Sequence, residues 1–234
     1  MPSDAVFRQF GHELLNVLGR VRGAADLLAD GSDTLTADEL AFATDLMRRE
    51  LPQAENVVRL FTLWGRYQAG GVLPLVPTDE AQDMATQLRE QALLAHQHAP
   101  EHPIGLALPE ALPTRLNQMA LKVIFEQLTQ NMARYACGPG VIRMQLRDGA
   151  SPAVPLTVLI EFANPTTETP PHEPLLPFSK GPGSKGAGLG LAVVQEAARA
   201  LEGRVAVAVQ DGVFKVTLAL PNTAGQNKTE PNPS

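Results

Sequence analysis

The segment GHELLN at residues 11–16 places a histidine, an acidic residue and an asparagine on one predicted helix. His12 lies about 200° from Leu14 around such a helix, so it projects away from the apolar side, and Asn16 shares its exposed face one turn on. An exposed imidazole beside the carboxylate of Glu13 suits nucleophilic chemistry, because the carboxylate can take the proton of one ring nitrogen while the other attacks. Taken alone, the trio also fits an ordinary surface histidine.

A second candidate site is the glycine-rich string GPGSKGAGLGL at residues 181–191, where a loop gives way to a predicted helix. Gly186, Gly188 and Gly190 lack side chains, so backbone N–H groups can approach an anion at the positive end of the helix dipole. Lys185 adds a cation in the same stretch. The string does not directly follow a strand, which argues against a Rossmann dinucleotide site. By itself it fits phosphate binding and simple loop flexibility equally well.

The third candidate is a polar stripe on a predicted helix over residues 113–136. Its members, spaced by three and four residues, are Gln127, Asn131, Arg134 and Tyr135. An asparagine oxygen can hold Mg²⁺ while an arginine neutralises a phosphate. The stripe alone also fits a solvated helix face.

Composition excludes several classes of protein. The chain has 234 residues and a net charge of −6, which argues against nucleic-acid binding through phosphate contacts. No apolar run is long enough for a membrane span and no export signal opens the chain, so we expect a cytoplasmic protein without a membrane segment. Cys137 is the only cysteine, which rules out an internal disulfide and a cysteine-rich zinc site.

Two helices are expected to position His12. The first carries an apolar stripe and stops at Gly31, and the second starts at a capping box formed by Thr36 and Glu39. Such a hairpin cannot bury both apolar stripes alone, so we expect two copies to associate as a four-helix bundle. The first stripe consists of Phe7, Phe10, Leu14, Leu18, Val21, Ala25 and Leu28, and the second of Leu40, Ala43, Met47, Ala54, Val57, Phe61 and Trp64, with a kink expected at Pro52.

The remaining chain alternates strand and helix signals, which predicts an α/β sandwich after the helical hairpin and an α+β fold class overall. A stretch with six prolines between Pro165 and Pro182 reads as a loop. The expected strands or extended segments are 72–77, 104–109, 141–148, 156–163 and a hairpin at 204–210 and 213–220 turned by Asp211-Gly212, and the expected helices are 79–98, 113–136 and 188–201.

The order of the three motifs resembles that of two-component sensor histidine kinases. A helical His-Glu-x-x-Asn is followed about 115 residues later by Asn-x-x-Arg-Tyr, and then by GxGLGL at the start of a helix. The resemblance covers roughly residues 5–220. It implies a dimerisation and histidine-phosphotransfer hairpin at 1–71, an ATP-binding domain of the Bergerat type at 72–222 and a disordered tail at 223–234.

The resemblance also implies a role for each candidate residue. His12 would accept the phosphoryl group of ATP, Glu13 would act as the base, and Asn16 would assist later transfer or hydrolysis. Asn131 would bind Mg²⁺, with Gln127 near the attacking group. Arg134, Tyr135, Lys185, Gly186, Gly188 and Gly190 would contact the nucleotide, and segment 165–185 would be the ATP lid, with PFSKG at 177–181 as its phenylalanine motif.

Two positions depart from the family's pattern. Val17 stands where a proline usually follows the histidine motif. The first glycine box is missing, and Asn164 stands where its aspartate would accept a hydrogen bond from the adenine amino group. An amide oxygen can still accept that bond, but loss of the charge costs about 1 kcal/mol or more.

These features leave three functional hypotheses. The first is a homodimeric histidine kinase that phosphorylates His12 and passes the phosphoryl group to an aspartate in the receiver domain of a response regulator. The second is a histidine phosphotransfer protein whose degenerate kinase-like domain binds no nucleotide. The third is a nonenzymatic dimeric regulator that docks on a response regulator and does not need His12.

Overall fold

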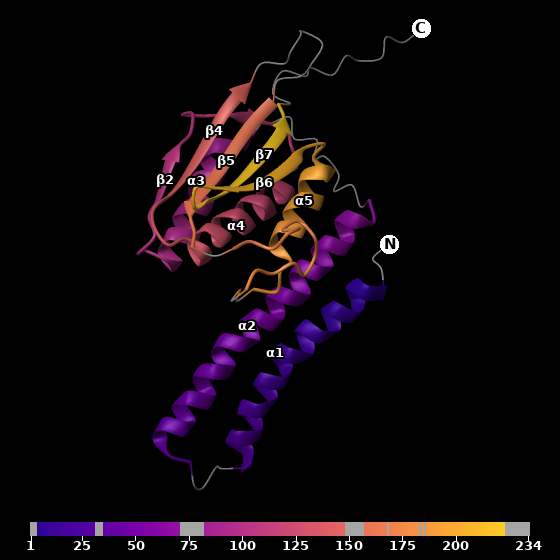
Figure 1. Ribbon diagram of the computed structural model, residues 1–234, viewed down its shortest axis with the longest axis vertical. Helices are drawn as coiled ribbons and strands as arrows, with labels where there is room; N and C mark the ends of the chain where they lie inside the picture. The colour runs from indigo at the N-terminus through magenta and orange to yellow at the C-terminus, as the bar shows by residue number, and fades with distance from the viewer. Residues whose placement is uncertain are drawn as a thin grey trace.

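A computed structural model of the protein describes residues 4–30, 35–70, 82–147, 157–167, 169–182, 184 and 186–222. Two long helices, α1 (Asp4–Asp30) and α2 (Ala37–Gln68), form an antiparallel hairpin that extends from a sheet domain (Figure 1). The expected capping box is present, because the Thr36 N–H donates to Glu39 Oε2 at 2.9 Å and the Glu39 N–H donates to Thr36 Oγ1 at 3.3 Å. The helix α2 continues through Pro52.

The apolar stripe of α1 is only partly buried by α2, as expected of a hairpin that cannot bury both of its apolar stripes alone. Val17 and Ala24 are the best-buried residues of α1, at 2% and 3% exposure, although neither was assigned to the stripe. Phe7 and Leu18, which were assigned to it, are 51% and 41% exposed. The two pairs lie on opposite sides of Leu14 around the helix, so α2 covers one edge of the stripe and leaves the other uncovered.

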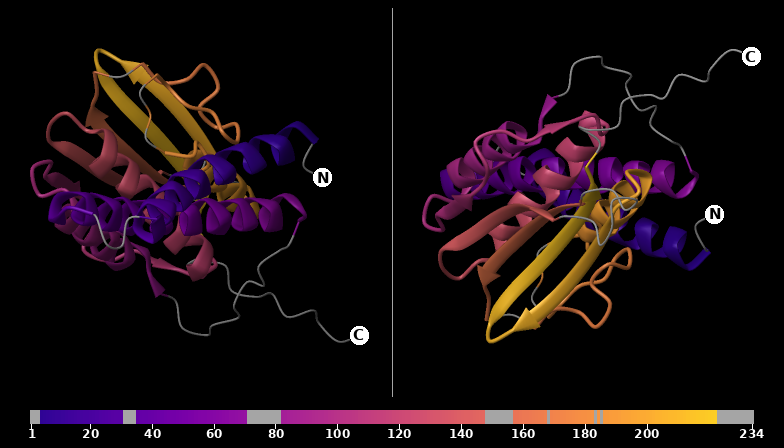
Figure 2. Two further views of the ribbon diagram at one scale, coloured as in Figure 1. Left: turned by 90° about the horizontal axis from the view of Figure 1, so that it is seen from below. Right: turned by 90° about the horizontal axis from the view of Figure 1, so that it is seen from above.

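The sheet domain contains a mixed five-stranded sheet in the order β2-β4-β5-β7-β6. Only β2 and β4 are parallel, and the remaining pairs are antiparallel. Three helices cover one face of this sheet, which makes the expected α/β sandwich (Figures 1 and 2). The strands are β2 (Ile104–Ala107), β4 (Gly140–Arg147), β5 (Thr157–Pro165), β6 (Arg204–Gln210) and β7 (Val213–Pro221), and the helices are α3 (Met84–His98), α4 (Gln118–Tyr135) and α5 (Gly190–Ala200).

The helices α3 and α4 begin later than the sequence predicted, because side-chain caps fix their first residues. The Asp83 carboxylate accepts from the N–H groups of Ala85 and Thr86, so α3 begins at Met84 instead of residue 79. The Asn117 side chain accepts from Ala120 N–H, so α4 begins at Gln118 instead of residue 113. The residues before these helices form a short antiparallel pair, β1 (Gln82–Asp83) and β3 (Pro113–Thr114).

The hairpin and the sheet domain share one hydrophobic core. Leu60, Trp64 and Tyr67 near the end of α2 are buried at 4%, 4% and 7% exposure, and they belong to the same cluster as Phe125 and Ile160 of the sheet domain. The helix α2 packs directly against α5. The lower end of the hairpin, by contrast, projects away from the sheet (Figure 1).

Some predicted segments lie outside the described residues: the extended stretch 72–77, most of the connection between α1 and α2, and the tail 223–234. No helix in the described part of the chain is both long and apolar enough to cross a membrane.

Candidate functional site

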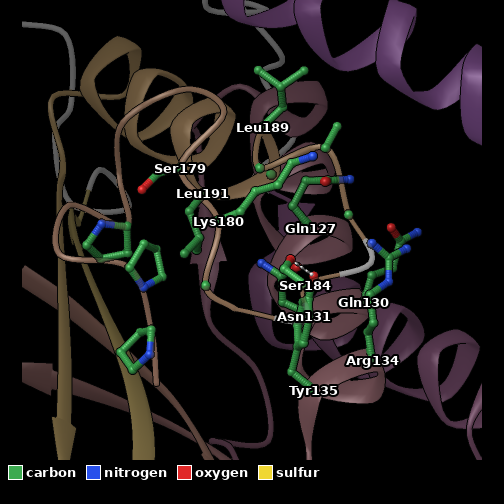
Figure 3. Close-up of a pocket in the computed structure, with 18 of the residues that line it drawn as sticks. Gln127, Gln130, Asn131, Arg134, Tyr135, Ser179, Lys180, Ser184, Leu189 and Leu191 are labelled. Atoms are coloured by element: carbon green, nitrogen blue, oxygen red, sulfur yellow. Dashed lines mark hydrogen bonds between the residues drawn. The ribbon is translucent and has the colours of Figure 1, made fainter. Parts of the chain in front are cut away.

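A pocket of about 130 Å³ lies where the start of α5 meets α4 and the loop that joins β5 to α5. This β5–α5 loop comprises residues 166–189, of which 168, 183 and 185 are not described. The helix α2 closes another side through Asn56 and Leu60. Figure 3 shows side chains of α4 and of the loop facing one another across the pocket.

All four residues of the predicted polar stripe on α4 line this pocket: Gln127, Asn131, Arg134 and Tyr135. Gln127 is only 4% exposed, and its Nε2 has no hydrogen-bond partner among the described residues. A buried donor without a partner is unfavourable, and an acceptor on a bound ligand would satisfy it. The stripe is therefore a pocket wall and not a solvated helix face.

The glycines at the start of α5 make room for these side chains. A Cβ atom on Gly186 would lie 3.1 Å from both Arg134 Nη1 and Tyr135 Oη, and one on Gly190 would lie 3.1 Å from Gln127 Oε1. The N-cap of α5, Leu189, makes no side-chain capping bond, so the first N–H groups of this helix are not capped from that position. Backbone donors at a helix start suit an anionic ligand. Lys185 lies outside the described residues.

Asn164 also lines the pocket, from the end of β5. It is 3% exposed, and its Nδ2 donates to the carbonyl oxygen of Pro165 at 3.3 Å. The hydroxyl groups of Tyr135 and Ser184 are 2.9 Å apart, which connects α4 to the β5–α5 loop. Ser184 was not among the predicted site residues.

The phosphoacceptor candidate lies on α1, beside this pocket. His12 and Asn16 are both exposed, as their position around the helix predicted. Glu13 is mostly buried, and its Oε2 forms an ion pair with Lys180 Nζ at 2.7 Å. Because Lys180 also lines the pocket, it connects the pocket to the residue next to His12. Both end-on views show the β5–α5 loop beside α1 (Figure 2).

Lys180 has no predicted role of its own, although it lies in the PFSKG string. A lysine two residues after a phenylalanine carries no local signal of an ion pair with a residue 167 positions away. The long sequence separation of Lys180 and Glu13 therefore hides their ion pair from any local pattern.

The charges of the pocket favour a phosphate-rich ligand. Its described lining contains the cations Arg134 and Lys180, several amides and hydroxyls, and no carboxylate. Within the described ranges, no three His, Cys, Asp or Glu side chains gather as ligands for a metal. Mg²⁺ is usually held by few protein ligands together with phosphate oxygens, so Asn131 suits an ion that arrives with a nucleotide.

No family model and no curated protein matches the sequence. The structure is similar to that of the histidine kinase AdeS from Acinetobacter baumannii, with a TM-score of 0.66 and 15% identity over 91% of this chain and 98% of that one. It is also similar to full-length ShkA, solved in complex with AMPPNP, with a TM-score of 0.59 and 19% identity over 95% of this chain and 46% of ShkA.

A third similar structure is the mycobacterial sensor histidine kinase MprB, with a TM-score of 0.51 and 16% identity over 61% of this chain and 97% of that one. The chain therefore shares the fold of solved histidine kinases, a helical hairpin followed by an α/β sandwich. At these identities the likeness concerns the fold, and the chemistry must be argued from the site.

Proposed function

We propose that the protein is an ATP-dependent histidine kinase that phosphorylates its own His12 and transfers the phosphoryl group to an aspartate in the receiver domain of a response regulator. The observation that carries this proposal is the Lys180–Glu13 ion pair, which links a cationic pocket, whose described lining has no carboxylate, to the carboxylate beside an exposed histidine. The proposed parts are the dimerisation and phosphotransfer hairpin at residues 1–71, the ATP-binding domain at 72–222 and the tail at 223–234. We place the reaction in the cytoplasm, where ATP is available.

In this proposal each wall of the pocket has a task. The triphosphate is held by the side chains of Arg134, Tyr135 and Lys185 and by the backbone of Gly186, Gly188 and Gly190. The Asn164 side chain accepts a hydrogen bond from the adenine amino group. The Gln127 amide donates to the nucleotide or orients the attacking group. Asn131 holds Mg²⁺ together with phosphate oxygens, and the ion supplies neutralisation of the phosphate charge.

The chemical step is a phosphoryl transfer to imidazole. One ring nitrogen of His12 forms a bond to the γ-phosphorus, the bond to the bridging oxygen breaks, and ADP leaves with the electron pair of that bond. Glu13 takes the proton from the other ring nitrogen, which keeps the product uncharged at the ring. The exposed position of His12 and Asn16 then leaves the phosphorylated ring open to a receiver domain, with Asn16 assisting the second transfer.

We also propose that the protein is a homodimer. Large apolar side chains remain exposed on both helices of the hairpin, including Phe7, Leu15 and Leu18 on α1 and Leu40 and Phe42 on α2. Exposed large apolar side chains on a helical hairpin favour association, and two hairpins packed together would form a four-helix bundle.

A second candidate is a phosphotransfer protein whose kinase-like domain binds no nucleotide. Two observations favour it: the first glycine box is missing around Asn164, and the pocket volume of about 130 Å³ is below the roughly 300–1,000 Å³ of common small-molecule sites. The set of polar groups that face the pocket favours the kinase, since a relay protein has no use for them.

The experiment that tests the proposal is incubation of the purified protein with γ-labelled ATP and Mg²⁺, beside His12→Gln and Asn131→Ala. Label that is acid-labile and base-stable, and that both substitutions abolish, supports the kinase. If ATP gives no label and no thermal shift, but His12 takes up phosphoryl groups from a phosphorylated receiver domain, the relay protein is correct. If the His12→Gln variant replaces the wild type in the cell without loss of function, the nonenzymatic regulator is correct.

A further inference from the structure

The ion pair between Lys180 and Glu13 joins the β5–α5 loop to the phosphoacceptor helix of the same chain. The Nζ–Oε2 distance is 2.7 Å, and the side chains are only 28% and 17% exposed. The second carboxylate oxygen of Glu13 accepts from Gln9 Nε2 at 3.3 Å, which fixes the carboxylate along α1. A shielded pair of this kind is weakened by water and salt less than a surface pair.

An aromatic contact supports the same docking from the other helix of the hairpin. The ring of Phe178, two residues before Lys180, lies 6.2 Å from the ring of Phe61 on α2. Phe61 in turn stacks on Phe10, with ring centroids 4.0 Å apart and planes inclined by 10°. Because Phe10 is one turn before Glu13 on α1, the aromatic contact and the ion pair hold the loop at the same level of the hairpin.

Lys180 can serve the pocket and Glu13 together. An ammonium group has three N–H donors, so the bond to Glu13 leaves two that are free to meet phosphate oxygens. In Figure 3 the Lys180 side chain extends across the pocket toward Gln127, which comes from the opposite wall. A nucleotide in this pocket would therefore be tied, through one side chain, to the helix that carries His12.

We infer that Lys180 is a positioning residue, which holds the nucleotide-binding loop against its own chain's α1 so that phosphorylation of His12 occurs within one chain of the dimer. The inference rests on the proposed kinase function for its chemistry, but the contact between Lys180 and Glu13 can be tested without it.

The contact is tested by crosslinking in the full chain. With Cys137→Ser as background, Glu13→Cys and Lys180→Cys are combined in one chain and treated with a short bismaleimide. A product of monomer mass whose two cysteine peptides are joined is expected. A covalent dimer, or no product, would overturn the intrachain contact.

The direction of phosphorylation is tested with mixed dimers of two differently tagged chains, one carrying His12→Gln and the other Asn131→Ala. With γ-labelled ATP, phosphorylation within a chain leaves both chains unlabelled, whereas the wild-type dimer is labelled. Label on the Asn131→Ala chain would overturn the inference. An unlabelled wild type overturns the kinase and the intrachain reaction together, and an intrachain crosslink would then show that the contact survives.

The positioning role is tested by comparing rate and affinity. Lys180→Ala is expected to slow His12 labelling by roughly 10- to 100-fold, because the acceptor and donor groups are less well aligned, with a smaller change in the Kd for ATP. Lys180→Arg retains the cation and is expected to restore most of the rate. A matched control is Lys215→Ala, which removes another partly exposed lysine ion pair, to Glu161 at 3.0 Å on the sheet, and is expected to leave labelling unchanged. Equal losses for Lys180→Arg and Lys180→Ala would contradict the role.

Discussion

A Cβ atom on Gly188 would lie 2.7 Å from the carbonyl carbon of Phe178 and 2.7 Å from the carbonyl oxygen of Ser179. Gly188 and Phe178 both adopt left-handed backbone conformations, with φ of +73° and +62°. The β5–α5 loop thus folds back onto the glycine string through a backbone contact that a side chain would block. This contact places Phe178 against α2 and Lys180 against α1.

Gly188→Ala is accordingly expected to displace the loop. The left-handed φ alone costs an alanine about 1–2 kcal/mol, and the overlap with the Phe178 backbone adds to it. Urea unfolding should show the loss of stability, and His12 labelling should fall with it. Gly105→Ala is the control, because its Cβ would meet only ordinary contacts at 3.6 and 3.8 Å. If both variants keep wild-type stability and labelling, the loop does not depend on this contact.

Trp64→Ala tests whether the hairpin and the sheet domain unfold together. Trp64 is 4% exposed in the core that they share, and loss of such a side chain costs about 3–5 kcal/mol. We expect the wild type and the variant each to unfold in one cooperative transition, whether unfolding is followed by circular dichroism or by proteolysis of either part. The transition of the variant should occur at a lower urea concentration than that of the wild type. The control on the same helix is Val58→Ala, whose side chain is 43% exposed and which should change stability little. Two separate transitions in the wild type would contradict a shared core.

Leu15→Asp tests the proposed dimer. Leu15 is 68% exposed on α1, and a buried carboxylate at the interface of two hairpins would be strongly unfavourable. Sedimentation should show a monomer for this variant and a dimer for the wild type at the same concentration. Leu93→Asp, at a position that is 59% exposed on α3, should remain dimeric. A wild-type monomer, or an unaffected Leu15→Asp dimer, would refute this interface.

Local signals in the sequence predicted the elements well where the deciding residues are neighbours. The Thr36–Glu39 capping box and the Asp211-Gly212 turn, with φ of 52° and 72°, appear as expected because each depends on a few consecutive residues. The helices α3 and α4 begin later than predicted, because their first residues are fixed by the Asp83 and Asn117 caps.

The site was predictable in part for the same reason. The spacing along α4 correctly placed Gln127 and Asn131 on one face, and that face lines the pocket. The ion pair of Glu13 with Lys180 joins residues far apart in the chain, so it can be identified only in the folded structure. Which edge of the α1 stripe is buried likewise depends on how α2 packs against it.

A pH dependence of stability is expected from Asp83. Burial raises the pKa of this carboxyl, but hydrogen bonds from the N–H groups of Leu112, Ala85 and Thr86 and from the Thr86 hydroxyl outweigh it, so the pKa lies below its usual value. A lowered folded-state pKa gives stability that is present above the unfolded pKa of about 3.9 and is lost as the pH falls through the folded value.

Urea unfolding of the wild type and of Asp83→Asn measures this contribution. An amide supplies only one of the two acceptor oxygens, so the variant should be less stable by about 1–2 kcal/mol at pH 7. That difference should shrink as the pH is lowered below about 3.9. Glu90→Gln, at an exposed position of α3, should show no such convergence. A difference that stays constant down to pH 3 would mean that the Asp83 charge is not the source.

Asn164→Asp tests how the pocket recognises the base of the nucleotide. In the proposed kinase, Asn164 accepts from the adenine amino group with an uncharged oxygen, and a carboxylate there would form a stronger, charge-assisted bond. A gain of about 1 kcal/mol corresponds to roughly fivefold tighter ATP binding, with no gain for GTP, whose base has a carbonyl oxygen in place of that amino group. Calorimetric titration with each nucleotide measures both.

The control for the added charge is Asn56→Asp, which places a carboxylate in the same pocket from α2. A charge that merely enters the pocket repels the phosphates, so this variant should bind ATP no better than the wild type. If Asn164→Asp is folded and also binds ATP no better, Asn164 does not face the adenine. If the wild type and both variants fail to bind ATP or GTP, the pocket holds no nucleotide and the kinase is refuted, and phosphoryl uptake by His12 then distinguishes the phosphotransfer protein from the nonenzymatic regulator.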